Sequence, residues 1–93
     1  KICKKYNIKI IEDAAEALGT YYKNKHAGTF GDIGIISFNG NKIITTGAGG
    51  AVLIKSAKIF KRIKDLATLA KKKNLLNINM FHITTGWQVL MLL

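Results

Sequence analysis

The hydrophobic residues of this chain come in short runs, separated by polar and glycine-rich stretches. Runs of this kind that are rich in β-branched residues are typical of strands buried within a sheet. Three of them predict strands, at residues 7–11, 34–38 and 51–54. Residues 1–6 have the pattern of a helix end, and residues 20–27 predict a hairpin with Asn24 near its turn.

A longer periodic segment follows the third predicted strand. Ser56 is suited to cap a helix that runs to about residue 73. Apolar residues recur there at helical spacing and predict one buried face. These residues are Ile59, Ile63, Leu66, Ala67 and Ala70. With a helical turn at residues 14–19 that a glycine closes, this order of elements predicts a layered α/β domain.

The end of the chain has a different character. Residues 74–93 show no clear periodicity, contain no acid and end in an apolar run. We therefore divide the chain into residues 1–73, which form the α/β part, and an atypical tail at residues 74–93. This tail is expected to be an interior segment cut short or sequence that is out of frame. Because the chain begins with Lys1 and predicts too few strands for a whole sheet, it is expected to be a section of a longer protein.

Composition narrows the class of protein only a little. The chain has 93 residues and a formal net charge of +10 at pH 7. Such a balance suits nucleic acid or an acidic surface, but the lysines are not interleaved with aromatic residues that could stack on bases. We expect the lysines on solvated faces, with neither nucleic acid nor membrane as a partner. Cys3 is the only cysteine, which excludes an intrachain disulfide and suits a reducing cytoplasm.

The sequence predicts no metal site. His82 has no cysteine or second histidine at metal-site spacing, and His26 is expected on the surface of the predicted hairpin. No stretch reaches the roughly 18 apolar residues of a membrane-spanning helix.

Three reactive side chains lie at the ends of predicted strands, where α/β sheets commonly bind ligands. Asp13 follows the first strand, Ser37 closes the second, and Lys42 lies in the glycine-rich loop beyond it. A carboxylate can hold a protonated ring nitrogen, a hydroxyl can bind phosphate, and a lysine can form a Schiff base. Pyridoxal phosphate requires these three contacts. On spacing alone, a capping aspartate, a strand-end serine and a solvated lysine remain the alternative.

Four motifs follow one another between residues 10 and 53. They are EDAAEA at 12–17, GTFGD at 28–32, SFNGNK at 37–42 and TGAGG at 46–50. Their wording and order closely resemble the DegT/DnrJ/StrS-type family of sugar aminotransferases, which are fold-type-I pyridoxal-phosphate enzymes. The resemblance implies that the chain is an incomplete part of the large cofactor-binding domain, with a mixed, mainly parallel sheet and flanking helices.

The resemblance also implies roles for four residues. Lys42 would bond pyridoxal 5'-phosphate and later carry a proton between the cofactor and the substrate. Asp13 would pair with the pyridine nitrogen, and Ser37 would help to hold the phosphate. Glu16 would lie near the ring hydroxyl or near the lysine.

By the same resemblance, the complete protein would be a cytoplasmic homodimer acting in surface glycan synthesis. It would transfer an amino group from an amino acid, usually glutamate, to a nucleotide-linked 4-keto-6-deoxy sugar. The SFNGNK wording resembles the branch that makes 4-amino sugars such as perosamine or the bacillosamine and legionaminic-acid precursors. Relatives that dehydrate the sugar carry histidine at the position of Lys42, which favours transamination.

The 93-residue chain alone is expected to be inactive. Two alternatives stay open. One is a non-functional remnant of an aminotransferase gene, and the other is a basic module that binds nucleic acid.

Overall fold

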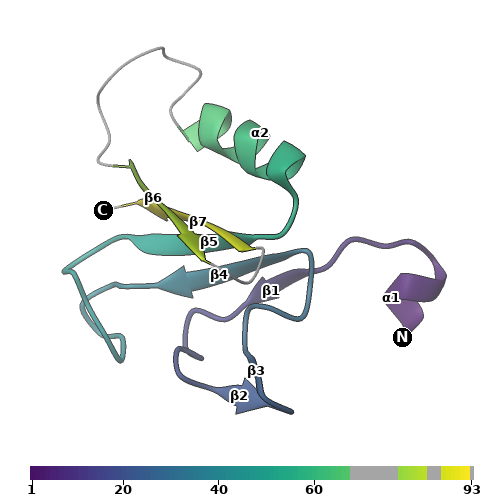
Figure 1. The fold of residues 1–93 in the computed structure, drawn as a ribbon. Helices are drawn as coiled ribbons and strands as arrows, with labels where there is room; N and C mark the ends of the chain where they lie inside the picture. Colours follow the sequence, from purple (N-terminus) through teal and green to yellow (C-terminus); the bar gives the residue numbers. More distant parts are fainter. Residues whose placement is uncertain (68–77, 84–86, 93) are drawn as a thin grey trace.

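The fold is built on a five-stranded sheet in the order β1-β4-β5-β7-β6, with a helix on one face and a small hairpin on the other (Figure 1). The computed structural model describes residues 1–67, 78–83 and 87–92. The sheet strands are β1 Ile11–Asp13, β4 Ile33–Ser37, β5 Gly50–Ile54, β6 Ile78–Ile83 and β7 Trp87–Leu92. The remaining elements are α1 Ile2–Lys5, the hairpin strands β2 Tyr21–Tyr22 and β3 Lys25–His26, and α2 Ala57–Ala67.

Most of the pairings in the described sheet are antiparallel. Only β1 and β4 run parallel, whereas β4–β5, β5–β7 and β6–β7 are antiparallel. The expectation of a mainly parallel sheet is therefore wrong for this chain, although the α/β class is confirmed. A parallel pair needs a long crossover, which residues 14–32 supply. The fully described loop at residues 38–49 contains no helix, and it returns the chain beside β4 in the opposite direction.

The strands β6 and β7 lie in the tail, where the sequence indicated no regular structure. β7 runs along β5, with Leu90 opposite Val52. Leu90 is fully buried and Val89 is 7% exposed. The pairing depends on the edge of β5, which is distant in sequence, so the local pattern of the tail does not reveal it. The predicted continuation of the helix to residue 73 and the division at residue 74 lie outside the described residues.

Side chains along the central strands point alternately to the two faces of the sheet, which creates two small hydrophobic cores, one on each face. The buried residues on the hairpin face are Ala14, Ile36, Ala51 and Val89. Those on the face that carries α2 are Ile54, Phe60 and Leu90.

Helix α2 begins as predicted and buries a slightly different face. The Ser56 Oγ accepts the Ile59 N–H at 3.4 Å, which is the predicted cap. Leu66 is 65% exposed, contrary to prediction, and Phe60 is buried instead. At about 100° per residue, positions 59, 60, 63 and 67 share one arc of the helix, and Leu66 falls just outside it. Neither described helix is long and apolar enough to cross a membrane.

Strand β1 begins later than predicted and is not buried. Of the predicted run at residues 7–11, only Ile11 belongs to the strand, and Glu12 and Asp13 complete it. Ile11 is 66% exposed and Ile8 is 55% exposed. Strand β1 lies at one edge of the sheet. Among the strands, α2 contacts only β5 and β7, so no described element covers the face of β1 that carries Ile11.

The hairpin is confirmed. Tyr22 lies opposite Lys25, and Lys23 and Asn24 form the two-residue turn between them. Both turn residues have positive φ angles, 48° and 59°. Two successive positive φ angles define a type I′ turn, a conformation that asparagine adopts more readily than lysine.

Asp32 fixes the segment that leads into β1. Its Oδ2 accepts the Ile10 N–H at 3.0 Å, and its Oδ1 pairs with the Lys9 ammonium at 3.1 Å. The Ile10 N–H and, after it, the Lys9 ammonium hold the pKa of the Asp32 carboxyl below its usual value. Both partners favour the charged carboxylate, which is why the pKa falls.

Replacement of Ile54 by alanine is expected to lower the free energy of unfolding by about 2–4 kcal/mol, because it opens a cavity beneath α2. Ile54 is fully buried there. Leu66→Ala is the control, and its effect should stay within about 0.5 kcal/mol because the side chain is exposed. Urea denaturation followed by circular dichroism measures both, and equal losses would contradict the assignment of the core.

Acid is expected to weaken the fold partly through Asp32. Because the folded-state pKa lies below the unfolded one, the contribution is present above the usual aspartate pKa and is lost as the pH falls through the folded-state pKa. Asp32→Asn should therefore lower the thermal midpoint at neutral pH. Its difference from the wild type should shrink below about pH 4. Melts across a pH series test this, and a difference that stays constant down to about pH 2 would refute it.

Candidate functional site

The carboxyl ends of the parallel strands β1 and β4 meet at one edge of the sheet. Asp13 ends β1 and is exposed, and Ser37 ends β4 and is half-buried. Asp13 lies opposite Ile35, and side chains alternate along a strand, so Asp13 and Ser37 point to the same face. Their Cα atoms are roughly 8 Å apart, one strand spacing across and two residues along. The structure thus places both predicted residues together at one edge of the sheet, of the kind where α/β sheets commonly bind ligands.

Both side chains keep hydrogen-bonding capacity for a ligand. One carboxylate oxygen of Asp13 accepts the Ala15 N–H at 3.2 Å, and the other has no partner among the described residues. The Ser37 Oγ accepts the Asn39 N–H at 3.3 Å. Because the hydroxyl acts as an acceptor in this bond, its own proton is free to donate to an anion.

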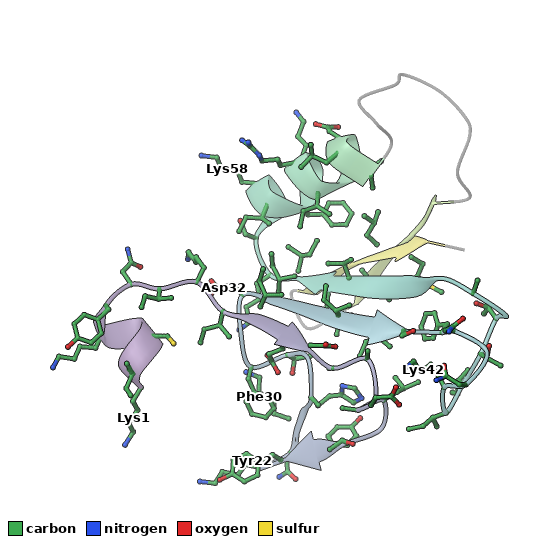
Figure 2. The ribbon with its side chains drawn as sticks, turned by 180° about the vertical axis from the view of Figure 1, so that it is seen from behind. Lys1, Tyr22, Phe30, Asp32, Lys42 and Lys58 are labelled. Atoms are coloured by element: carbon green, nitrogen blue, oxygen red, sulfur yellow. The ribbon has the colours of Figure 1, made fainter. Side chains whose placement is uncertain are left out.

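Lys42 lies in the loop between β4 and β5, beyond the end of β4 (Figure 2). Two hydrogen bonds close the base of this loop, from the Phe38 N–H to the Gly49 carbonyl at 3.0 Å and from the Thr46 N–H to the Phe38 carbonyl at 3.1 Å. The Lys42 N–H donates to the Asn39 carbonyl at 3.0 Å. The side chain is therefore presented by a turn whose ends are fixed to the sheet.

The Lys42 ammonium contacts the Glu16 carboxylate, which lies in the turns that follow β1. The Lys42 side chain is 14% exposed and that of Glu16 is 72% exposed, so the pair is open to solvent from the glutamate side. The contact agrees with the expectation that Glu16 lies near the lysine, while its role stays a prediction. It ties the amine to the segment that directly follows Asp13.

The groups at this edge suit pyridoxal phosphate chemically. The cofactor needs a carboxylate for its ring nitrogen, donors for its phosphate and an amine for its aldehyde. Asp13 has an oxygen without a described partner, Ser37 has a free hydroxyl proton, and the Lys42 amine contacts Glu16 in the turns after β1. The residues therefore fit the cofactor, and their individual roles stay predictions.

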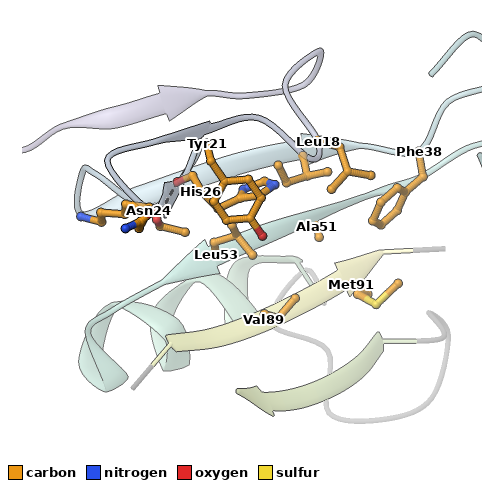
Figure 3. Close-up of a pocket in the computed structure, with 12 residues that line it drawn as sticks. Leu18, Tyr21, Asn24, His26, Phe38, Ala51, Leu53, Val89 and Met91 are labelled. Atoms are coloured by element: carbon orange, nitrogen blue, oxygen red, sulfur yellow. Dashed lines mark hydrogen bonds between the residues drawn. The ribbon is translucent and has the colours of Figure 1, made fainter. Parts of the chain in front are cut away.

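A separate hollow of about 560 Å³ lies between the hairpin and the sheet (Figure 3). Apolar side chains of the hairpin face dominate its lining, among them Leu18, Phe38, Leu53 and Met91. None of the four predicted site residues lines it, and its lining includes no carboxylate. We therefore place the candidate site at the strand-end edge and not in this hollow.

His26 lines the hollow and is half-buried, so the expectation of a surface histidine is wrong. Its Nε2 accepts the Gly19 N–H at 2.8 Å, and its ring meets Tyr21 edge-on with centroids 5.1 Å apart. These contacts tie the hairpin to the turns after β1. Within the described residues, no three His, Cys, Asp or Glu side chains are placed to hold a metal ion. The His82 side chain lies outside the described part.

A sequence model of the DegT/DnrJ/EryC1/StrS aminotransferase family matches residues 1–91. The chain belongs to this family. The match includes the four motifs, the whole of β6 and most of β7. The DegT-type resemblance of the motifs is thereby confirmed.

Individual relatives of this DegT-type chain agree. It is 49% identical over 71 residues, 76% of its length, to a candidate pyridoxal phosphate-dependent aminotransferase, EpsN, from Bacillus subtilis (strain 168). It is 50% identical over 62 residues, 67% of its length, to GDP-perosamine synthase from Escherichia coli O157:H7. It is 43% identical over 74 residues, 77% of its length, to UDP-4-amino-4,6-dideoxy-N-acetyl-beta-L-altrosamine transaminase from Campylobacter jejuni.

The DegT-type chain spans only 17–20% of the length of these three relatives. It is thus homologous to part of several sugar-nucleotide aminotransferases of a pyridoxal-phosphate-dependent family. The match supports the fold class, since the family is of fold type I and the chain shows a mixed α/β sheet.

The Glu16–Lys42 contact predicts that Lys42 reacts slowly with amine-acylating reagents. Acylation requires an accessible amine, and the Lys42 side chain is 14% exposed while that of Lys9 is 71% exposed. Brief treatment with acetic anhydride, followed by peptide mass spectrometry, should show slower modification of Lys42. Glu16→Gln should raise the Lys42 rate and leave the Lys9 rate unchanged. An unaltered Lys42 rate would count against the pair.

Proposed function

We propose that the protein carrying this chain transfers an amino group from an amino acid, with glutamate as the expected donor, to the keto group of a nucleotide-linked 4-keto-6-deoxy sugar for surface glycans. One observation carries the proposal. Asp13 and Ser37 end parallel strands on the same face and edge, and Glu16 ties the Lys42 amine to that edge. The names of two relatives, a perosamine synthase and an altrosamine transaminase, support this class of substrate.

In this proposal each residue acts at a stated atom. When bound, pyridoxal phosphate would supply an electron sink for the bonds of the amino-bearing carbon. Lys42 is the residue that would hold the cofactor through its Nζ, and as a free amine it would carry a proton to or from the substrate carbon. The Asp13 carboxylate would hold the pyridine nitrogen, and its negative charge would favour the protonated form of that nitrogen.

The other two residues position groups around this centre. The Ser37 hydroxyl would help to hold the phosphate by donating its free proton to it. The Glu16 carboxylate holds the Lys42 ammonium at the edge before the cofactor arrives. Because Glu16 is largely exposed, it can turn away to solvent when the amine changes partner.

Two finer parts of the proposal, the homodimer and the branch that makes 4-amino sugars, rest on the family resemblance. The cytoplasmic location and the absence of nucleic-acid and membrane partners rest on the single cysteine, the spacing of the lysines and the short apolar runs. That the chain alone is inactive also stays a prediction.

Reduction with borohydride in the presence of pyridoxal phosphate should attach the cofactor to Lys42 in the complete protein. Peptide mass spectrometry locates the adduct. Lys42→Arg keeps the positive charge but should abolish the adduct, and it should lower amination of a GDP- or UDP-linked keto sugar roughly 10²–10⁴-fold through loss of the proton carrier. Lys23→Arg, in the exposed hairpin turn, is the matched control. An adduct at another lysine, or none in the folded protein, would overturn the proposal.

A further inference from the structure

Glu12 precedes Asp13 in β1 and points to the opposite face of the strand. Its Oε2 accepts the Gly28 N–H at 2.9 Å, and its Oε1 accepts the Gly31 N–H. Each carboxylate oxygen thus accepts one backbone N–H from the loop at residues 27–32, which joins the hairpin to β4. Hydrogen bonds to an ionised acceptor are stronger than neutral ones, so this double link is a strong contact between the loop and β1.

The loop comes this close because of its glycines. Gly28 has a φ of +84°, which residues with side chains rarely adopt. A Cβ at Gly31 would lie 2.7 Å from the Ile10 carbonyl oxygen, and one at Gly34 would overlap the Gly28 carbonyl. The spacing G-x-x-G-x-x-G therefore brings backbone donors against the strand.

Two further contacts hold the same loop. Asp32 reaches back to the Ile10 N–H, so carboxylates connect the loop and the β1 segment in both directions. The Lys55 ammonium, just beyond β5, donates to the Gly31 carbonyl at 3.0 Å. The loop is thus attached to both the first and the third strands along the sheet.

We propose that Glu12 is a positioning residue for the cofactor site. By holding residues 28–31 against β1, it sets the register of β1 on β4 and hence the direction of the Asp13 carboxylate. β1 has only three residues and pairs only with β4 among the described strands, so its own ladder restrains it weakly. A slip of one residue would turn Asp13 to the hairpin face, away from Ser37. The link to the cofactor rests on the proposed function, whereas the hydrogen-bonded loop does not.

Glu12→Gln tests the inference, because glutamine keeps the shape but offers a single acceptor oxygen, which leaves one N–H without a partner. In this variant, amide exchange at Gly28 or Gly31 should rise at least about tenfold by NMR. In the complete protein, the affinity for pyridoxal phosphate should fall by about tenfold. The absorption band of the bound cofactor should shift in the same direction as in Asp13→Asn. Ile54→Ala is the control: it destabilises the fold from the α2 side but should leave the band unchanged.

The outcomes separate the two proposals. Faster exchange together with a band shift like that of Asp13→Asn supports the positioning role. Faster exchange with the wild-type band and affinity overturns it. If the wild type takes up no cofactor, the proposed function fails, and amide exchange alone then tests the role of Glu12. Unprotected Gly28 and Gly31 amides in the wild type would overturn the inference. Amides that are protected only when Glu12 is intact would support its structural part. Should Glu12→Gln not fold, Glu12→Asp, which keeps the charge but shortens the reach, provides the same comparison.

Discussion

The candidate site depends on the parallel pairing of β1 with β4. This is the only parallel pair in the described sheet, and parallel pairing is what brings two carboxyl ends to the same edge. A three-residue strand at the end of the sheet order cannot secure that pairing through its ladder alone. The carboxylates of Glu12 and Asp32, which take backbone N–H groups across the two segments, supply the missing restraint.

The distribution of acids follows from this arrangement. Of five acids in a chain with a net charge of +10, four lie between residues 12 and 32, and each contacts a backbone N–H or a lysine. The lysines need no such placement, because most solvated positions accept them. Negative charge is thus concentrated around β1, where it holds backbone, and at the edge, where it faces Lys42. A basic composition, which taken alone suited nucleic acid, is thus compatible with a group of acids around β1.

The elements that the sequence predicted well are those that are determined by residues close together in the sequence. Asn24 in a two-residue turn, Ser56 before a helix and the glycine with positive φ at Gly19 each act within a few residues. The failures are non-local. Ile8 and Ile11 have the pattern of a buried strand, yet no described element covers them. Strand β7 pairs with the edge of β5, which the chain creates more than thirty residues earlier, and β6 then pairs with β7. The sheet direction also changes where a loop without a helix replaces the usual crossover.

The site divides in the same way. Strand-end reasoning predicted that Asp13 and Ser37 share an edge, and the register confirms it. The proximity of Glu16 to Lys42 followed only from the family resemblance, since 26 residues separate them. The sequence did not indicate a role for Glu12. Its partners are main-chain N–H groups 16 and 19 residues away, and no pattern of side chains identifies them. Alternation along β1 nevertheless assigns the two adjacent acids to opposite faces. Glu12 holds the loop, and Asp13 points to the same face as Ser37 at the strand-end edge. In the proposed positioning role, the anchoring of Glu12 sets the direction of Asp13.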